Sequence, residues 1–157
     1  MIIREARLGD ASKILQLIHG LADYEKAPEQ VVATVEKIEE SLFCDAPVAF
    51  CLLAEIEDEI VGFAIWFKNY STWLGEPGIY LEDLYVDSAY RAQGIGTALM
   101  KHLAQMCVHL GYRRFQWWVL DWNKPAIDFY QSIGAEPMDE WTVFRLSGNA
   151  LAEFAKS

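Results

Sequence analysis

The sequence predicts an α/β fold in which a central mixed β-sheet is flanked by helices on both faces. The main observation is the order of the apolar runs, which reads as strand, helix, helix, three strands, helix, strand, helix and strand, followed by a C-terminal helix. The three consecutive strands favour an antiparallel meander, and the strand–helix–strand that follows them favours a parallel pair. The chain has 157 residues and no internal repeat, so we expect one domain over residues 1–157.

The first third of the chain is expected to form one strand and two helices. Residues 2–6 are a short apolar segment that predicts the first strand. Asp10 is a good helix starter, and apolar residues then follow at helical spacing, which predicts a helix over residues 10–24. Pro28 ends this element or turns the chain beyond it. A second helix is expected over residues 32–42.

The meander is predicted by three apolar runs in the middle of the chain. Residues 49–56 and 60–67 read as the two strands of a hairpin, and the charged residues 57–59 read as its turn. A loop is expected over residues 70–78, which contain a tryptophan, two glycines and a proline. A third long strand follows over residues 79–86 and carries two adjacent acidic residues in its middle.

The second half of the chain is expected to contain three helices and two strands. They are a long helix from residue 95 to a stop at Gly111, a strand over residues 115–120, a short helix from Pro125 to Gly134, a last strand over residues 142–146, and a C-terminal helix capped by Ser147.

The charge distribution argues against several classes of partner. The chain has 23 acidic and 13 basic residues and a net charge of −10. Residues 1–86 hold 16 acidic and 6 basic residues, whereas residues 87–157 hold 7 of each. Because no basic face is visible, we expect neither nucleic acid nor an anionic membrane surface as a partner. The acidic half attracts a small cation or simply keeps the surface soluble.

The cysteines and histidines give no sign of a metal site. Cys44, Cys51 and Cys107 are widely spaced and read as free thiols in a reducing compartment. His102 and His109 are seven residues apart on one expected helix, and no third ligand accompanies them. No apolar run approaches the roughly 20 residues that span a bilayer, and the N-terminus lacks the layout of a signal peptide. We therefore expect a cytoplasmic protein.

The most informative segment is residues 91–97, RAQGIGT, which joins the end of a strand to the start of a helix. Backbone N–H groups at such a junction are unpaired within the helix and form an anion site, and glycines allow a pyrophosphate to approach. A Walker loop would need a lysine after Gly96, where Thr97 stands. A dinucleotide fingerprint would need a third glycine, where Leu99 stands. Coenzyme A remains as a candidate, beside the alternative of a plain tight turn.

Two motifs resemble the GNAT superfamily of N-acetyltransferases. One is the pattern of Arg91, Gly94 and Gly96 between a strand and a long helix, which is similar to the superfamily's Arg/Gln-x-x-Gly-x-Gly/Ala signature. The other is residues 120–135, LDWNKPAIDFYQSIGA, which resemble the superfamily's N-x-x-A-x-x-F-Y-x-x-x-G block. The expected element order is similar to that of the superfamily from residue 3 to residue 146. The resemblance implies a GNAT-type acyl-CoA N-acyltransferase fold and acetyl-CoA as co-substrate.

Further motifs resemble the diamine (spermidine/spermine) acetyltransferase family, and most closely its thialysine Nε-acetyltransferase branch. The family motifs are IYLEDLYV at residues 79–86, YRAQGIG at 90–96 and LADYEK at 21–26; the branch motifs are YEK at 24–26, YSTW-x-G at 70–75 and VLDWN at 119–123. The resemblance implies an enzyme that transfers acetyl directly, in a ternary complex, to the primary amine of a thialysine- or lysine-like amino acid, a diamine or a polyamine. It also implies a homodimer.

The catalytic roles follow from the resemblance and from what acetyl transfer to an amine requires. Glu82 is the expected base for the ammonium group, and we expect it to point to the opposite face of its strand from Asp83. Tyr130 is the expected acid for the leaving thiolate, since a phenol with a pKa of ~10 stays protonated at neutral pH. A backbone N–H near Leu84 is the expected donor to the developing oxyanion. The alternatives are a structural hydrogen bond for Glu82 and core packing for Tyr130.

The resemblance also implies two sets of binding residues. For the co-substrate they are Leu84, Tyr85, Val86, Arg91, Ala92, Gln93, Gly94, Ile95, Gly96, Thr97, Asn123, Lys124, Pro125 and Ala126. For the amine they are Tyr24, Glu25, Trp73, Glu82, Gln116, Trp117 and Trp118. Asn123 is also placed to cap the helix that begins near Pro125, and one or both of the paired tryptophans could instead belong to the core.

Two other functions stay open at this point. A protein or peptide N-acetyltransferase would need an open groove, and the bulky loop that carries Trp73 argues against one. A non-catalytic regulatory module that binds coenzyme A would not need Glu82 and Tyr130. Lys26 bears on the substrate, because it would repel a polycation and could instead meet a substrate carboxylate.

Overall fold

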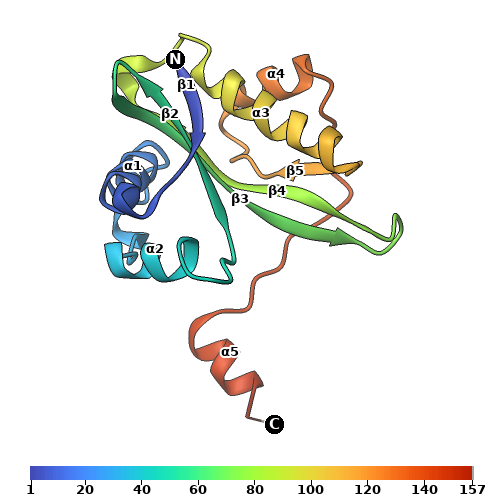
Figure 1. The fold of residues 1–157 in the computed structure, drawn as a ribbon. Coiled ribbons are helices and arrows are strands. Elements are labelled where there is room, and N and C mark those ends of the chain that lie inside the picture. Colours follow the sequence, from blue (N-terminus) through green and yellow to red (C-terminus); the bar gives the residue numbers. More distant parts are fainter. Residues whose placement is uncertain (157) are drawn as a thin grey trace. The chain divides into compact units, whose positions relative to one another are not determined.

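The computed structural model describes residues 1–156 and shows five strands, five α-helices and three short 3-10 helices in that part of the chain (Figure 1). In chain order they are β1 (Ile2–Glu5), η1 (Leu8–Asp10), α1 (Ala11–Tyr24), η2 (Pro28–Gln30), α2 (Val35–Leu42), β2 (Phe50–Ile56), β3 (Glu59–Ser71), β4 (Glu76–Val86), η3 (Ser88–Tyr90), α3 (Ile95–Leu110), β5 (Phe115–Trp117), α4 (Lys124–Ser132) and α5 (Gly148–Phe154). The chain divides into two compact units, Met1–Trp118 and the residues from Val119 onward.

The first unit holds a single mixed sheet with the strand order β1-β2-β3-β4-β5. The strands β1 to β4 pair antiparallel, and β5 pairs parallel with β4. The predicted meander and the predicted parallel strand are therefore confirmed. The turn between β2 and β3 has positive φ at both Glu57 (51°) and Asp58 (65°). A two-residue hairpin needs this geometry, because the strands it joins twist to the right.

Helices cover both faces of the sheet (Figure 1). On one face α1 and α2 bury a cluster that includes Ile14, Leu17 and Leu53. On the other face lies α3, since a Cβ added at Gly62 of β3 would come within 3.6 Å of Ile95. The buried residues Leu99 and Leu103 continue the inner face of α3. These two layers fix the positions of the C-terminal end of α1 and the N-terminal end of α3.

Glycine defines both ends of α3. Gly94 precedes the helix with a φ of 76°, and Gly111 follows it with a φ of 74°. The N–H of Tyr112 donates to the Cys107 carbonyl at 2.8 Å, and the N–H of Gly111 donates to the Val108 carbonyl at 3.2 Å. This pattern is a Schellman cap, which a left-handed residue makes possible and which satisfies the last carbonyl groups.

A β-bulge interrupts β4 at its two adjacent acidic residues. Asp83 lies opposite Ile65 of β3, whereas Leu81 lies opposite Trp66, so Glu82 is an extra residue without a partner on β3. A bulge of this kind breaks the alternation of side chains between the two faces.

The bulge corrects the expectation that Glu82 and Asp83 point to opposite faces. Leu81 and Leu84 lie opposite Trp66 and Ala64, which are two residues apart on β3 and so share a face. Leu84 faces α3, because a Cβ at Gly96 would lie 3.5 Å from it. The two acidic residues between Leu81 and Leu84 therefore both lie on the side of the sheet away from α3.

Several expected boundaries also change. The residues 142–146 form no strand, and there Phe144 is 92% exposed. An extended apolar segment becomes a strand only beside a partner edge, and no strand of residues 1–156 pairs with this one. The hairpin of β3 and β4 is longer than predicted, because only residues 72–75 remain as its loop. The last sheet strand, β5, ends at Trp117 and not at residue 120.

The second unit consists of α4, α5 and irregular connections. Asn123 caps α4, since its Oδ1 accepts a hydrogen bond from the N–H of Ala126 at 3.4 Å. Lys124 pairs with Asp128 one turn along, at 2.8 Å. The cap and this pair favour a helix at the predicted place. The expectation of one domain over residues 1–157 stays a prediction.

Candidate active site

The strands β4 and β5 separate halfway along β4. The parallel pairing with β5 covers only Ile79–Leu81, opposite Phe115–Trp117, while β4 continues along β3 to Val86. No strand of residues 1–156 pairs with residues 82–86 on the β5 side. The sheet is therefore open beside the second half of β4.

The backbone of β4 directs N–H and C=O groups into this opening, where a ligand can form hydrogen bonds with them. The N–H of Asp87 donates to the Val61 carbonyl at 2.8 Å, which sets the alternation of the antiparallel ladder. By that alternation the backbone groups of Tyr85 face β3, whereas those of Leu84 and Val86 face away from β3. Their N–H and C=O groups are available to an extended ligand with amide groups.

The turn before α3 has the geometry of an anion site. The first bond of the helix runs from the N–H of Ala98 to the Gly94 carbonyl at 2.9 Å. The N–H groups of Ile95, Gly96 and Thr97 precede it and have no acceptor within the helix. A Cβ at Gly96 would occupy the space between the turn and Leu84. These residues fit a pyrophosphate that continues into an amide-containing arm, as in coenzyme A.

Arg91 connects this turn with the end of α1. Its Nε donates to the Val86 carbonyl at 3.2 Å. Its guanidinium carbon lies 4.8 Å from the centre of the Tyr24 ring and 5.5 Å from the centre of the Tyr85 ring. These distances lie within the range of cation–π attraction. A residue predicted for the co-substrate and one predicted for the amine thus touch each other.

Three carboxylates lie close together on the side of the sheet away from α3. Burial, followed by the charges of Glu82 and Glu25, raises the pKa of Asp83 to about 6. Burial also raises the pKa of Glu25. Tyr80 has its pKa raised to about 12 by burial and by the two acidic residues of the bulge. A cation placed among these groups would relieve their repulsion.

The expectation from sequence reasoning did not include Asp83 or Tyr80 in the site. The alternation of side chains along a strand predicts that Asp83 lies on the far face, and the bulge breaks this alternation. The available signal was the cost of two carboxylates within an apolar strand. A strongly shifted pKa beside an opening in the sheet is typical of functional residues.

The three expected residues in and directly after β5 divide between the two faces. Gln116 lies opposite Tyr80, and Trp118 meets the Tyr80 ring edge-on at 6.0 Å. Both therefore lie on the face of the acidic residues. Trp117 lies opposite Leu81 and packs against Phe115 at 4.8 Å, on the α3 face. The structure thus brings Gln116 and Trp118 toward the acidic residues but directs Trp117 to the other face.

Trp73 does not join this group in the described chain. It lies at the tip of the β3–β4 hairpin and is 92% exposed. At the usual rise per strand residue, the six steps along the chain from Glu76 to Glu82 span roughly 20 Å. Tyr24 and Glu25, by contrast, lie at the end of α1, and the charge of Glu25 reaches Asp83.

Asn123, Lys124, Pro125, Ala126 and Tyr130 belong to the second unit. The alternative for Asn123 is confirmed, because it caps α4. Its expected contact with the co-substrate stays a prediction, as do those of Lys124, Pro125 and Ala126. Tyr130 lies on α4 beside Phe129, with their ring centres 5.7 Å apart, and its acid role also stays a prediction.

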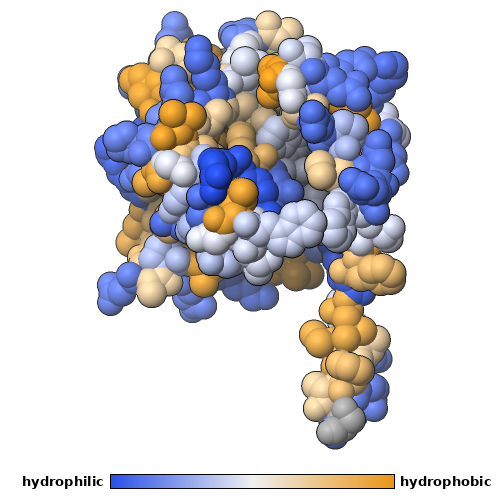
Figure 2. All heavy atoms as spheres, turned by 90° about the vertical axis from the view of Figure 1, so that its right-hand side faces the viewer, coloured by the Kyte–Doolittle hydropathy of each residue, from blue (hydrophilic) through white to orange (hydrophobic). Residues whose placement is uncertain are grey.

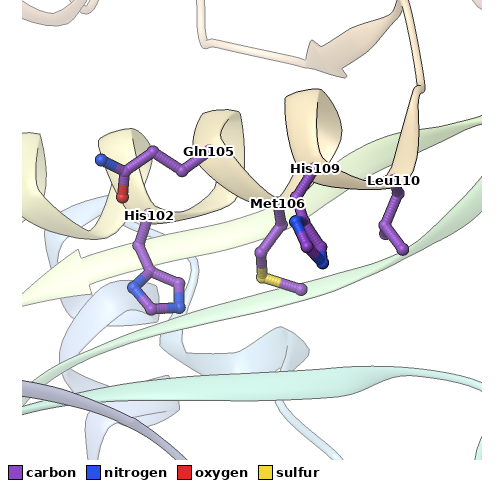
Figure 3. A pocket seen from close by; sticks show the side chains of 5 residues that line it. All are labelled: His102, Gln105, Met106, His109 and Leu110. Atoms are coloured by element: carbon purple, nitrogen blue, oxygen red, sulfur yellow. The ribbon is translucent and has the colours of Figure 1, made fainter.

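A shallow hollow of about 310 Å³ lies along α3, away from the residues described above. Figure 3 shows His102, Met106 and His109 on the same side of this helix. Residues 1–156 contain no group of three or more side chains arranged to bind a metal. Within the same residues, no helix has the length and apolar composition that crossing a membrane requires.

Comparison with known proteins gives consistent matches. Residues 16–135 match the Acetyltransferase (GNAT) family. The chain is 40% identical to "Thialysine N-epsilon-acetyltransferase" of Bos taurus, over 99% of this chain and 97% of that protein. It is 34% identical to "Spermidine/spermine N(1)-acetyltransferase-like protein 1" of Homo sapiens, over 98% of this chain but 23% of that protein. A solved integron cassette protein from the mobile metagenome of V. cholerae superimposes with a TM-score of 0.83, at 28% identity, over 99% of this chain and 98% of that one.

Proposed function

Because the chain belongs to the acetyltransferase (GNAT) family and is an N-acetyltransferase, we propose that it acetylates the primary amine of a small molecule. The candidate substrates are a thialysine- or lysine-like amino acid, a diamine and a polyamine. The name of the Bos taurus relative supports the first of these. The observation that carries the proposal is the group of Glu25, Glu82 and Asp83 beside the opening of the sheet.

These carboxylates bind the substrate as an ammonium ion. Asp83 is mostly buried, so its charge is weakly screened and attracts a cation strongly. Tyr24, Tyr80 and Trp118 offer aromatic surface near the acids, which suits a cation or a methylene chain. The amine must then lose a proton before it can act as a nucleophile.

Glu82 removes that proton. It is exposed at the bulge and adjoins Asp83, which keeps the negative charge near the amine. A carboxylate accepts the proton directly or through one water molecule. The alternative, in which Glu82 only binds the cation, predicts a different pH dependence and is tested below.

The backbone at the opening holds the co-substrate, which supplies an acetyl thioester. The N–H groups of Ile95, Gly96 and Thr97 bind its pyrophosphate, and the backbone of Val86 pairs with its amide arm. The N–H of Leu84 donates to the carbonyl oxygen as negative charge develops there. Tyr130 protonates the departing thiolate.

The proposed enzyme acts as a homodimer. The chain from residue 141 to residue 154 exposes large apolar side chains, among them Trp141 (69%), Phe144 (92%) and Phe154 (74%). Figure 2 shows the C-terminal helix as largely hydrophobic spheres. Exposed apolar surface of this kind in an ordered segment indicates a binding partner. A second copy is the partner that the resemblance to diamine acetyltransferases implies.

An assay of free thiol release from acetyl-CoA tests the proposal. The amines are thialysine, lysine, putrescine, spermidine and an aminoalkylphosphonate, with a lysine-containing peptide as the test of protein acetylation. We expect release that depends on at least one small amine and not on the peptide. Coenzyme A binding without amine-dependent release would instead indicate a regulatory module.

Lys26 separates the amino acids from the polyamines in this panel. If Lys26 meets a substrate carboxylate, Lys26→Ala raises the KM for thialysine and lysine about tenfold, the loss expected for one charge-assisted hydrogen bond. The same variant leaves the KM for putrescine unchanged or lowers it, because a repulsive charge has gone.

A further inference from the structure

The guanidinium group of Arg91 lies at a position that also suits the ammonium group of the substrate. Its guanidinium lies 4.8 Å from the Tyr24 ring and 5.5 Å from the Tyr85 ring. Glu25 is the residue after Tyr24, and its charge reaches Asp83. A planar cation therefore covers an aromatic surface beside the carboxylates that would bind a substrate ammonium.

The Arg91 side chain also donates a hydrogen bond to a backbone carbonyl group that the co-substrate would use as an acceptor. Arg91 donates to the Val86 carbonyl at 3.2 Å. The ladder between β3 and β4 directs that carbonyl into the opening of the sheet. One side chain thus contacts elements of both expected binding sites.

An anion at the start of α3 would compete for this arginine. Arg91 precedes the turn by only three residues and is largely exposed, so its side chain can turn toward Ile95–Thr97 without disturbing the core. A charge-assisted bond between guanidinium and phosphate is stronger than contact with a neutral carbonyl and two aromatic rings.

We propose that Arg91 couples the two binding sites. In the free protein the Arg91 side chain covers the Tyr24 ring and the Val86 carbonyl. When coenzyme A binds, this side chain moves to the pyrophosphate and exposes the binding site for the substrate ammonium group. Coenzyme A therefore strengthens amine binding, and by linkage the amine strengthens coenzyme A binding by the same factor. The inference rests on the proposed function, since it requires both ligands to bind in the first unit.

Calorimetric titration of thialysine, or of whichever amine the panel above selects, tests the coupling. The titration is made with and without saturating coenzyme A, which has no acetyl group to transfer, so no reaction occurs. We expect coenzyme A to lower the Kd of the amine about tenfold in the wild type. Arg91→Gln removes the cation but keeps an N–H donor for phosphate, and it should reduce the factor to within about twofold by tightening binding to the free protein.

Two comparisons separate this coupling from simple electrostatics. Arg113→Gln removes an equal charge from the ion pair with Glu76, which lies next to the loop of the β3–β4 hairpin, and it should keep the tenfold factor. Because bound coenzyme A also attracts the amine through its own negative charge, a factor that stays tenfold in Arg91→Gln would overturn the role of Arg91. So would equal amine affinity with and without coenzyme A in the wild type. Failure of either ligand to bind any form of the protein would instead overturn the proposed function.

Discussion

Asp83 shows how one residue can be costly for folding and useful for binding. It is mostly buried next to Glu82 and within reach of the charge of Glu25, and its pKa rises to about 6 as a result. The folded protein therefore retains a proton that the unfolded chain releases between about pH 4 and pH 6. Stability falls as the pH rises through this window, and the ionised carboxylate remains a destabilising charge at neutral pH.

The first prediction concerns the stability of Asp83→Asn. At pH 7.5 the variant should be more stable than the wild type by on the order of 1–3 kcal/mol, because each unit of pKa shift corresponds to about 1.4 kcal/mol. The advantage should shrink toward pH 4, where the wild-type carboxyl is protonated. Urea denaturation at the two pH values measures it.

A control and an activity measurement complete this experiment. Glu76 has its pKa lowered by the hydrogen bond from Arg113, so Glu76→Gln should not gain stability at pH 7.5. Asp83→Asn should also raise the KM for the amine. A variant no more stable than the wild type at either pH would show that the carboxylate is not strained by its surroundings.

The second prediction distinguishes the two roles of Glu82. If it removes the ammonium proton, Glu82→Gln should lower kcat/KM most at low pH, where little neutral amine exists, and least at high pH. If Glu82 only binds the cation, the pH profile should keep the wild-type shape and drop uniformly. A pH–rate series on the folded variant decides between these shapes.

The third prediction concerns Tyr130, the expected acid. Tyr130→Phe should lower kcat by roughly 10²–10⁴-fold while the Kd for coenzyme A stays nearly unchanged, because only the proton donor is lost. Phe129→Leu, on the neighbouring residue of α4, is a matched control for packing. A thermal midpoint that falls equally in both variants, without a specific loss of kcat, would assign Tyr130 to packing.

At the scale of elements, local signals in the sequence predicted most of the secondary structure. The helix ends at Gly94, Gly111 and Asn123 could be predicted from the sequence, because each of these helix caps needs a particular residue type. The bulge at Glu82 was not visible, because it depends on how β4 pairs with β3 and not on either strand alone. The sequence therefore misplaced Asp83, whereas the role expected of Glu82 stays a prediction.

The fourth prediction tests the turn before α3. A Cβ at Gly96 would lie 3.5 Å from Leu84 and 3.9 Å from Val86, which are ordinary contacts, so the fold should tolerate a small side chain there. Gly96→Val should nevertheless weaken acetyl-CoA binding by tenfold or more in Kd, about 1.4 kcal/mol, because it fills the space of the phosphate. Calorimetry on the folded variant measures the change.

A second glycine provides the control for this substitution. Gly9 has no atom within 4 Å of an added Cβ and lies in a short 3-10 helix, so Gly9→Val should leave the Kd unchanged. Equal affinity of Gly96→Val and Gly9→Val for acetyl-CoA would remove the pyrophosphate from the start of α3.

At the scale of the whole molecule, the fifth prediction is a homodimer. Phe144 and Trp141 are largely exposed in an extended segment that the sequence predicted as a strand. Sedimentation at micromolar concentration should give twice the mass of the chain, and Phe144→Asp should lower it to that of one chain, because a buried unpaired charge opposes association. A wild-type protein that sediments as a monomer would contradict the assignment.

The C-terminal segment also shows why the sequence could not predict the whole molecule. The pattern at residues 142–146 is as apolar as that of a sheet strand, yet a strand needs a partner edge that its own sequence does not contain. The same limit applies to Trp73, because the glycines and the proline near it predict a loop but not its distance from the acidic residues.

The unequal strand lengths have a consequence for local opening of the hairpin. Pairing of β3 with β2 reaches only as far as Trp66 opposite Phe50, so residues 67–71 of β3 hydrogen-bond to β4 alone. Amide hydrogens in residues 67–78 should therefore exchange with deuterated solvent through a partial opening that leaves residues 61–65 protected. The loop lies within this outer half, so a protease should cut the chain first at residues 72–75.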